Sequence, residues 1–510
     1  EKGIPIDYIA GTSIGAIVGG LYAAGYSTEE MEAIFCNPEF DNILTGKMEG
    51  DYYFFFKQQE VNSTWLQLKF DMDSAIFLPS LTFNIVSPHQ MDFAFMEYFS
   101  KSDYISKNNF DSLFIPFRCI VTDATNGKEV VVDKGPLKDA VRASMTYPIY
   151  FNPIRIDSNL VYDGGIVNNF PLDVMCNDFD IDYIIGVTVT KPKKESTEDN
   201  IITTLINIMV QKEHSTIPCK TGIIVRPNVP DLALTDFKEG GKTIEIGYQT
   251  MLDSLSLFED KISRRLPIDT VASRRQEYRK KAKEILIGSV KVMGLNPSQS
   301  IFIENIILEK NEIITLEELK VRYFRLVVED KIENIYPYLV YDSIANYYEI
   351  ILHATPVKPF QANFGGYVSA NAYSTFFLQL QYKYLGLQSI TAAVDAYFGR
   401  FYNSVVLSTR LDYLKKPTFF QHIKTGYNRW NYFNTYRSFV GSETPSYLIH
   451  EETFFDYNIA FPTANKSKIY GGFTIMHVKD RYYQSNVYLK EDVYDNNRFN
   501  GISPFIVYEY

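Results

Sequence analysis

Short apolar runs alternate with longer helical stretches through the first 290 residues of the chain. Ile6–Ala10 is typical of a short apolar strand, and Ile14–Ala24 of a helix rich in small residues that ends at Gly25. A charged helical stretch is predicted over Ser254–Ile287. This alternation predicts an α/β layered sheet. Further strands are predicted at Phe114–Asp123, Lys128–Val132 and Ile181–Val189.

The pattern changes after Pro297, where residues 299–357 are expected to form a small unit of mixed strands and helices. Its predicted elements are a strand at Phe302–Glu309, a helix at Leu316–Val327, a partly helical stretch at Lys331–Val340 and a strand at Tyr347–Ala354.

From residue 360 to 510 the chain is rich in aromatic residues, and segments of about ten residues alternate between apolar and polar positions. Alternation with aromatic ends is typical of transmembrane β-barrel strands. The same alternation also fits a soluble β-sandwich or barrel. The clearest segments are Thr375–Tyr384, Ser389–Phe398, Ser404–Tyr413 and Lys468–Val478.

Composition narrows the class of protein. The chain has 510 residues, enough for roughly two to four domains. Its formal charge of -11 gives no support for a nucleic-acid partner. No apolar run reaches the ~18–20 residues of a transmembrane helix. The four cysteines form no CxxC pair, so we expect buried apolar residues rather than a zinc site or a disulfide framework; they are Cys36, Cys119, Cys176 and Cys219.

Gly11-Thr12-Ser13-Ile14-Gly15 matches the G-x-S-x-G pattern of a nucleophile elbow, with a strand running in and a helix running out. Flanking glycines would allow the strand and helix to approach closely. At the helix N-terminus, Ser13 could act as a nucleophile while the N–H of Ile14 donates to an oxyanion. The alternative is a structural N-cap serine in a glycine-rich turn.

A nucleophilic serine needs a base. His89 and His214 are the histidines of the α/β part, and neither sits beside a glycine turn or a strand end. Asp163 ends an apolar strand, and Gly164-Gly165 allows a tight turn after it. Taken alone, this segment also fits an ordinary Asp-Gly turn.

The elbow and its helix, followed by Ala143–Pro148 and then Asp163-Gly164-Gly165, closely resemble the patatin-like phospholipase family. The resemblance covers residues 1–290 and implies a three-layer α/β/α hydrolase domain. It also implies a Ser-Asp dyad, with Ser13 as nucleophile, Asp163 as base and no histidine, and Ala143–Pro148 as a helix and turn supporting the site. No metal or organic cofactor is implied.

The remaining chain resembles a subfamily in which this domain is fused to its own barrel. Residues 299–357 resemble a polypeptide-transport-associated (POTRA) domain of α+β type, and residues 360–510 resemble part of an antiparallel outer-membrane barrel of the surface-antigen type. The family's glycine-rich oxyanion loop precedes the elbow and is missing here, and Tyr510 lies in a strand-like run. We therefore expect the sequence to be truncated at both ends.

The resulting expectation is a bacterial outer-membrane lipid acyl hydrolase whose substrate is a phospholipid or another acyl lipid, with the hydrolase domain in the periplasm, at the surface or secreted. One alternative is an outer-membrane assembly or transport protein with an inactive hydrolase-like head. A second keeps the chemistry but changes the substrate to neutral acylglycerols or acyl thioesters.

Overall fold

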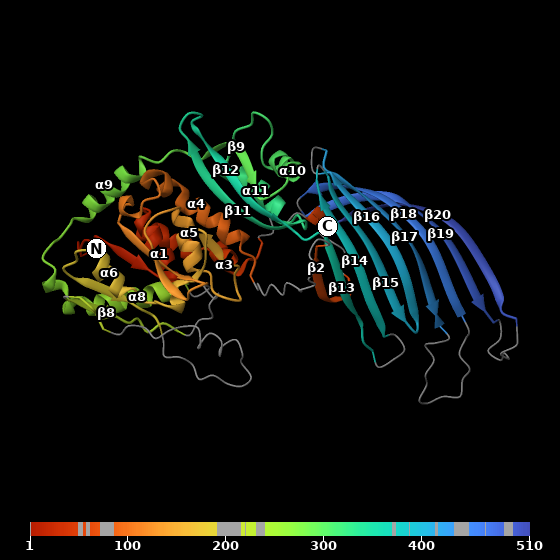
Figure 1. Ribbon diagram of the computed structural model, residues 1–510, viewed down its shortest axis with the longest axis horizontal. Helices are drawn as coiled ribbons and strands as arrows, with labels where there is room; N and C mark the ends of the chain where they lie inside the picture. The colour runs from red at the N-terminus through yellow and green to blue at the C-terminus, as the bar shows by residue number, and fades with distance from the viewer. Residues whose placement is uncertain are drawn as a thin grey trace.

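The computed structural model arranges the chain as an N-terminal α/β domain, a middle unit and a large C-terminal sheet (Figure 1). Among the residues described, no helix has both the length and the apolar character needed to cross a membrane. The structure describes residues 2–48, 55–57, 62–71, 86–190, 216–219, 221–230, 240–369, 374–386, 388–413, 417–432, 448–464, 466–483 and 493–510.

The sheet of the N-terminal domain has the order β1-β3-β6-β5, with β4 also paired to β3. Strand β1 is parallel to β3, whereas β6 is antiparallel to it. All seven residues of β3 are buried, so this strand forms the centre of the domain. The strands are β1 (Ile9–Gly11), β3 (Phe117–Asp123), β4 (Lys128–Val132), β5 (Ile154–Ile156) and β6 (Asn159–Asp163).

Helices α1 and α5 lie side by side against this sheet and share its main apolar core. The predicted α/β class, the first helix and strand β4 are confirmed, and Gly25 follows α1 with a φ of 94°. The predicted strand Ile181–Val189 is shorter in the structure. The remaining elements are α1 (Ile14–Ala23), α2 (Thr28–Phe35), α3 (Pro38–Thr45), α4 (His89–Ser106), α5 (Leu137–Ser144), α6 (Leu172–Asp178), β7 (Ile184–Val187), β8 (Gly222–Val225), α8 (Gly240–Ser254) and α9 (Ile268–Arg279).

The cysteine prediction was wrong for one pair. Cys176, in α6, and Cys219, just before β8, form a disulfide across a sequence separation of 43 residues. Cys119 is buried as expected, whereas Cys36 is exposed. Spacing along the chain could not reveal the pair, because it forms only when the fold brings α6 beside the parallel pair β7-β8.

The middle unit is a four-stranded sheet of order β10-β9-β12-β11 packed against two helices. Helix α11 and strand β12 match the prediction. The sheet begins at Leu286, ahead of the predicted unit at 299–357. Its elements are β9 (Leu286–Met293), α10 (Pro297–Ile307), β10 (Ile314–Thr315), α11 (Leu316–Val327), β11 (Ile332–Asp342) and β12 (Tyr347–Pro356).

Two predictions in this unit were wrong. Phe302–Glu309 was expected to be a strand, but α10 covers most of it, because Asn296 and Gln299 form a capping box and Pro297 occupies the first helical turn. Lys331–Val340 was expected to be partly helical, but all of it except Lys331 lies in β11. Pairing along the full length of β12 decides this, since cross-strand pairing overrides weak local preference.

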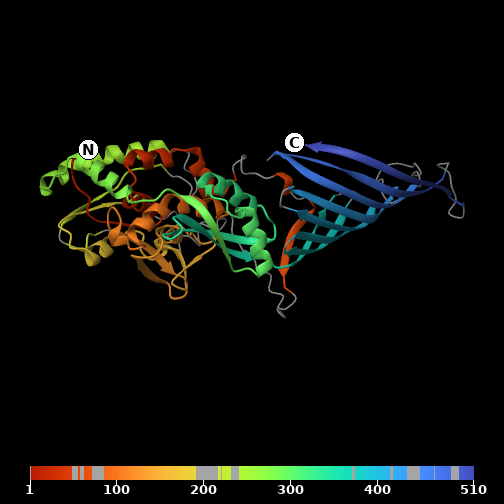
Figure 2. The ribbon, with the colours of Figure 1, turned by 90° about the horizontal axis from the view of Figure 1, so that it is seen from above.

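The C-terminal sheet is antiparallel and open, with strands β13 to β20 in sequence order. The predicted barrel strands are confirmed as strands, with β14, β15, β16 and β19 matching the four clearest segments. Figure 2 shows the sheet curving away from the middle unit. Its strands are β13 (Phe360–Tyr367), β14 (Thr375–Leu385), β15 (Ser389–Gly399), β16 (Tyr402–Tyr413), β17 (Phe419–Asn431), β18 (Leu448–Ala464), β19 (Ser467–Tyr482) and β20 (Asp495–Glu509).

A ninth strand of this sheet comes from the N-terminal part of the chain. Strand β2 (Thr64–Phe70) pairs antiparallel with β13, although it lies between α3 and α4 in sequence. The nearby short helix η1 (Phe55–Lys57) buries the Phe56 ring against Phe420 on β17, with 5.1 Å between the ring centroids. The N-terminal domain is therefore joined to the sheet by non-covalent contacts as well as by the chain.

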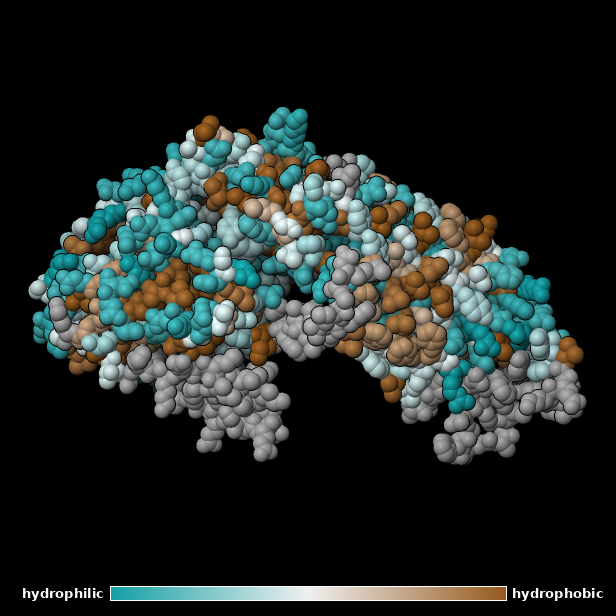
Figure 3. All heavy atoms as spheres, in the orientation of Figure 1, coloured by the Kyte–Doolittle hydropathy of each residue, from teal (hydrophilic) through white to brown (hydrophobic). Residues whose placement is uncertain are grey.

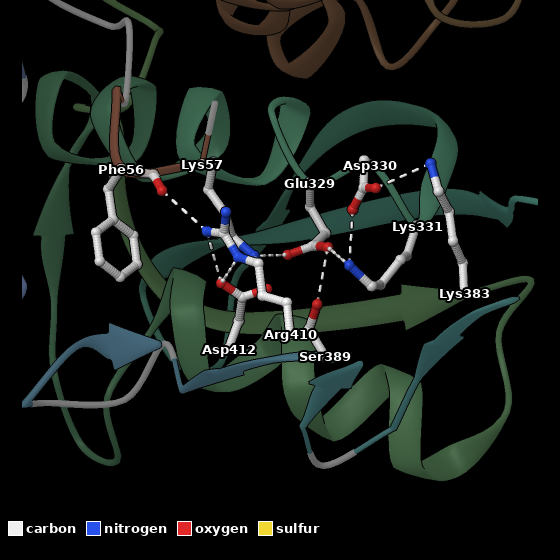
Figure 4. A network of polar contacts seen from close by, with 9 residues as sticks. All are labelled: Phe56, Lys57, Glu329, Asp330, Lys331, Lys383, Ser389, Arg410 and Asp412. Carbon is white, nitrogen blue, oxygen red and sulfur yellow. Dashed lines mark hydrogen bonds and ion pairs between the residues drawn. The ribbon is translucent and has the colours of Figure 1, made fainter. Parts of the chain in front are cut away.

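Figure 4 shows a buried charge network at this junction. Lys57 Nζ lies 2.7 Å from a Glu329 carboxylate oxygen of the middle unit and 3.3 Å from an Asp412 carboxylate oxygen on β16. All three side chains are at most 5% exposed. Buried carboxylates need a cation close by, so Lys57 ties the three parts of the molecule together.

Candidate active site

Ser13 occupies the turn between β1 and α1 in a strained backbone conformation. Its φ is 55° and its ψ is -124°, outside the regions that side chains other than glycine prefer. Strain of this kind costs about 1–3 kcal/mol and persists only where the surroundings fix it. Here the Ser13 N–H donates to Ser144 Oγ at 2.8 Å, and the Ser13 carbonyl accepts from Ala16 in α1.

Gly11 and Gly164 are required by close backbone approaches. A Cβ at Gly11 would lie 2.2 Å from the Gly15 carbonyl oxygen, and one at Gly164 would lie 2.3 Å from the Ile120 carbonyl oxygen. The expectation that both elbow glycines serve close packing is wrong for Gly15, where a Cβ would meet no atom within 4 Å. The space beside Gly15 is open instead.

Asp163 ends β6 and is buried, with 4% of its surface exposed. Its backbone N–H donates to the Thr146 carbonyl at 2.9 Å, and its carbonyl accepts from the Thr122 hydroxyl at 2.8 Å. One carboxylate oxygen, Oδ1, accepts from the Gly165 N–H at 2.7 Å. These contacts hold both the backbone and one side of the carboxylate, and they leave Oδ2 for another donor.

That donor is the Ser13 hydroxyl. Ser13 Oγ lies 2.7 Å from Asp163 Oδ2, although the two residues are 150 positions apart in sequence. Burial raises the pKa of Asp163 to about 6, and the hydrogen bonds from Gly165 and Ser13 oppose that rise. The carboxylate is therefore a stronger proton acceptor than an exposed aspartate and still largely ionised at neutral pH.

Ser144, the last residue of α5, and Met145, directly after it, also contact Ser13. Ser144 is fully buried, and its hydroxyl donates to the Ile120 carbonyl at 2.7 Å while it accepts the Ser13 N–H. The Met145 sulfur lies 3.7 Å from Ser13 Oγ. The sequence pointed to Ala143–Pro148 only as a support, and it gave no signal that Ser144 would contact the Ser13 backbone directly.

The N–H of Ile14 is available for a further acceptor. Within the described residues it has no hydrogen-bond partner, whereas the next two N–H groups donate to Thr12 and Ser13 carbonyls. It lies at the N-terminus of α1, where the helix dipole favours negative charge.

Of the two histidines considered as alternative bases, the structure describes only His89. His89 begins α4, and burial lowers its pKa, while the Asp92 charge and a hydrogen bond with the Ile335 backbone oppose that effect. It therefore faces the middle unit. His214 lies outside the described residues. Across the part of the chain that the structure describes, no group of three or more His, Cys, Asp or Glu side chains is placed to hold a metal ion.

The N-terminal region is similar to proteins of a known family. Residues 1–175 match the family model of patatin-like phospholipases. The N-terminal part of the chain therefore carries a patatin-like phospholipase domain. The match includes both Ser13 and Asp163 and ends within α6.

Relatives of this domain occur in much longer proteins. A patatin-like phospholipase domain-containing protein of Caenorhabditis elegans is 30% identical over 180 residues, which are 35% of this chain and 11% of that protein. A lysophospholipase of Mycosarcoma maydis is 31% identical over 175 residues, 34% of this chain and 8% of that protein. The chain thus spans about a tenth of the length of these relatives.

Two solved structures are similar to part of the chain. BamA from Haemophilus ducreyi aligns with a TM-score of 0.34 and 11% identity, covering 44% of this chain and 43% of that one. CdiB from Acinetobacter baumannii aligns with a TM-score of 0.28 and 8% identity, covering 52% of this chain and 56% of that one.

Proposed function

We propose that the protein is a lipid acyl hydrolase that uses a Ser13–Asp163 dyad. The observation that carries the proposal is the 2.7 Å hydrogen bond from the Ser13 hydroxyl to a buried carboxylate whose pKa is raised to about 6. The family match and the strained elbow support it. The substrate class we propose is a phospholipid or lysophospholipid ester.

In the proposed reaction, Ser13 Oγ attacks the ester carbonyl carbon as Asp163 takes the hydroxyl proton. The N–H of Ile14 donates to the oxyanion of the tetrahedral intermediate. When the intermediate collapses, the proton on Asp163 passes to the departing alcohol and the acyl group stays on Ser13. Water then attacks the acyl-serine, giving its proton to Asp163, and the fatty acid leaves as Ser13 recovers a proton.

The test is a lipid-class hydrolysis panel on the wild-type protein and the Ser13→Ala variant, with folding checked by circular dichroism. Loss of the nucleophile should reduce turnover by several orders of magnitude. His89→Ala is the control for a histidine base and should keep far more activity than Ser13→Ala, because His89 contacts the Ile335 backbone rather than Ser13. A folded Ser13→Ala protein that keeps more than about a tenth of the activity would rule out the assignment. So would failure of wild-type Ser13 to react with a fluorophosphonate, which would favour an inactive head.

We also propose that the domain is displayed at an outer membrane, with residues 286–357 as a POTRA-like unit and 360–510 as part of the membrane barrel. Large apolar side chains are exposed at alternating positions of the C-terminal sheet, and apolar patches are visible over it (Figure 3). Soluble proteins rarely expose an apolar surface of this extent. Examples from six strands of this sheet are Leu380, Val394, Leu407, Phe455, Ile475 and Ile506.

The disulfide between Cys176 and Cys219 agrees with this location, since disulfides persist in oxidising compartments such as the periplasm. Fractionation of cells expressing the complete gene checks the proposal. We expect the protein in the outer-membrane fraction, requiring detergent for extraction. Recovery as a soluble protein without detergent would contradict it.

A further inference from the structure

Strand β11 of the middle unit lies against helices α4 and α5 of the patatin-like domain. Side chains along a strand alternate between its two faces. Ile335 belongs to an apolar core that the middle unit shares with Phe93 and Met96 of α4, whereas the rings of Tyr336 and Tyr338 contact Lys138 of α5. This contact places the middle unit beside α5, the helix whose C-terminal end lies at the candidate active site.

Tyr336 and Tyr338 enclose a buried lysine of α5. Lys138 Nζ lies 3.8 Å from the ring centroid of Tyr336 and 3.6 Å from that of Tyr338, and its side chain is 3% exposed. The Asp139 carboxylate lies 2.6 Å from the same ammonium and also accepts the Tyr336 hydroxyl at 2.7 Å. Aromatic faces attract a cation most strongly where water is excluded. The two rings therefore replace much of the hydration that Lys138 loses.

The opposite end of α5 holds both members of the dyad. The helix has eight residues and is about 12 Å long, so its two ends are separated by little more than two turns. At its C-terminal end, Ser144 accepts the Ser13 N–H, and the Thr146 carbonyl just beyond it accepts the Asp163 N–H. A tilt of α5 would move the supports of both residues together.

Buried polar contacts stiffen this connection. Arg142, in the last turn of α5, is 1% exposed, and its guanidinium contacts Asp92 of α4 at 2.7 Å and the Thr146 hydroxyl at 2.6 Å. Leu137, at the start of α5, donates its N–H to Asp103 of α4. Helix α4 therefore contacts both ends of α5, and β11 adds contacts at the end that carries Lys138.

We propose that Tyr336 and Tyr338 are positioning residues for the dyad, so that full hydrolytic activity requires the middle unit to be docked on α5. This inference rests on the proposed function, because it assigns a role in the reaction of Ser13 and Asp163. Neither tyrosine touches the dyad. Both act through α5, whose displacement by a fraction of an ångström would lengthen the Ser13–Asp163 hydrogen bond.

The test compares full-length variants in detergent, using a soluble short-chain ester and a fluorophosphonate that reacts with Ser13. The Tyr336→Ala/Tyr338→Ala double variant should lose about tenfold in kcat and in labelling rate, because misplacement of reacting groups by ~1 Å can cost up to ~100-fold. Its KM for the short ester should stay within about twofold, because neither tyrosine contacts Ser13 or Asp163. Tyr336→Phe should lose less, since it keeps the ring over Lys138.

Tyr341→Phe is the matched control. It removes a hydroxyl from the same strand, where the partner is Asn346 in the adjoining turn, so labelling should be unchanged. Equal labelling rates for the folded double variant and the wild type would overturn the inference. If the double variant fails to fold, the two single variants decide. Equal rates of fluorophosphonate labelling for Tyr336→Phe and Tyr341→Phe would then overturn the inference. Ser13→Ala separates the two proposals, because wild-type-like labelling of that variant would refute the dyad itself.

Discussion

Replacing Asp163 with asparagine tests the electrostatic argument for the dyad directly. The carboxyl is buried, and burial raises its pKa from 3.8 to about 6. In the unfolded chain the same group ionises at its ordinary value, so the folded state binds the proton more tightly. Between those two pKa values stability falls as pH rises, because the ionised carboxylate is less stable in the fold than in water.

The size of this loss of stability follows from the shift in the pKa of Asp163. A difference of about two pKa units corresponds to on the order of 3 kcal/mol of lost stability at pH 8, falling to about half of that at pH 5. Asparagine is uncharged at every pH. Its Oδ1 can still accept from the Gly165 N–H, and its Nδ2 can donate to Ser13 Oγ. Asp163→Asn should therefore be inactive yet more stable than the wild type at pH 8.

The assay is thermal unfolding of both proteins at pH 5 and pH 8, followed by near-ultraviolet circular dichroism. At pH 8 the variant should unfold roughly 6–12 °C higher, with a smaller gain at pH 5. Ester turnover should fall by about 10²–10⁴-fold, since the general base is lost. A variant that is less stable than the wild type at both pH values would refute the reasoning that burial destabilises this carboxylate.

Three further outcomes are expected. The wild-type kcat/KM should decline as pH falls through about 6, because protonated Asp163 cannot accept the Ser13 proton; a profile flat from pH 5 to 8 would contradict this. Ser144→Ala should cost about 2–4 kcal/mol in urea unfolding and slow ester turnover, because it leaves the Ser13 N–H and a buried carbonyl without their partner. Replacing Cys176 and Cys219 by alanine should lower stability by roughly 2–4 kcal/mol, and an unchanged unfolding midpoint under oxidising conditions would count against the disulfide.

Local patterns were enough to predict several parts of this protein. The strand, serine turn and small-residue helix around Ser13 are contiguous in sequence, so their chemistry could be read in order. Period-two alternation predicted the strands of the C-terminal sheet, since successive side chains of a strand point to opposite faces of the sheet. Where two local signals competed, as in Phe302–Glu309, the capping residues that decided for a helix lay just outside the apolar run.

Other features depend on residues that only the fold brings together. Asp163 was singled out by its turn and by a family resemblance, but its raised pKa arises from burial that no local pattern reports. The disulfide of Cys176, the pairing of β2 with β13 and the ion pairs of Lys57 all join segments distant in sequence. The sequence by itself determined most of the local helices, strands and turns and the side chains that they carry, because propensity and periodicity act within a few residues. The tertiary structure decided which side chains come into contact and what pKa the ionisable ones have, because burial and the distance to a partner are properties of the whole fold.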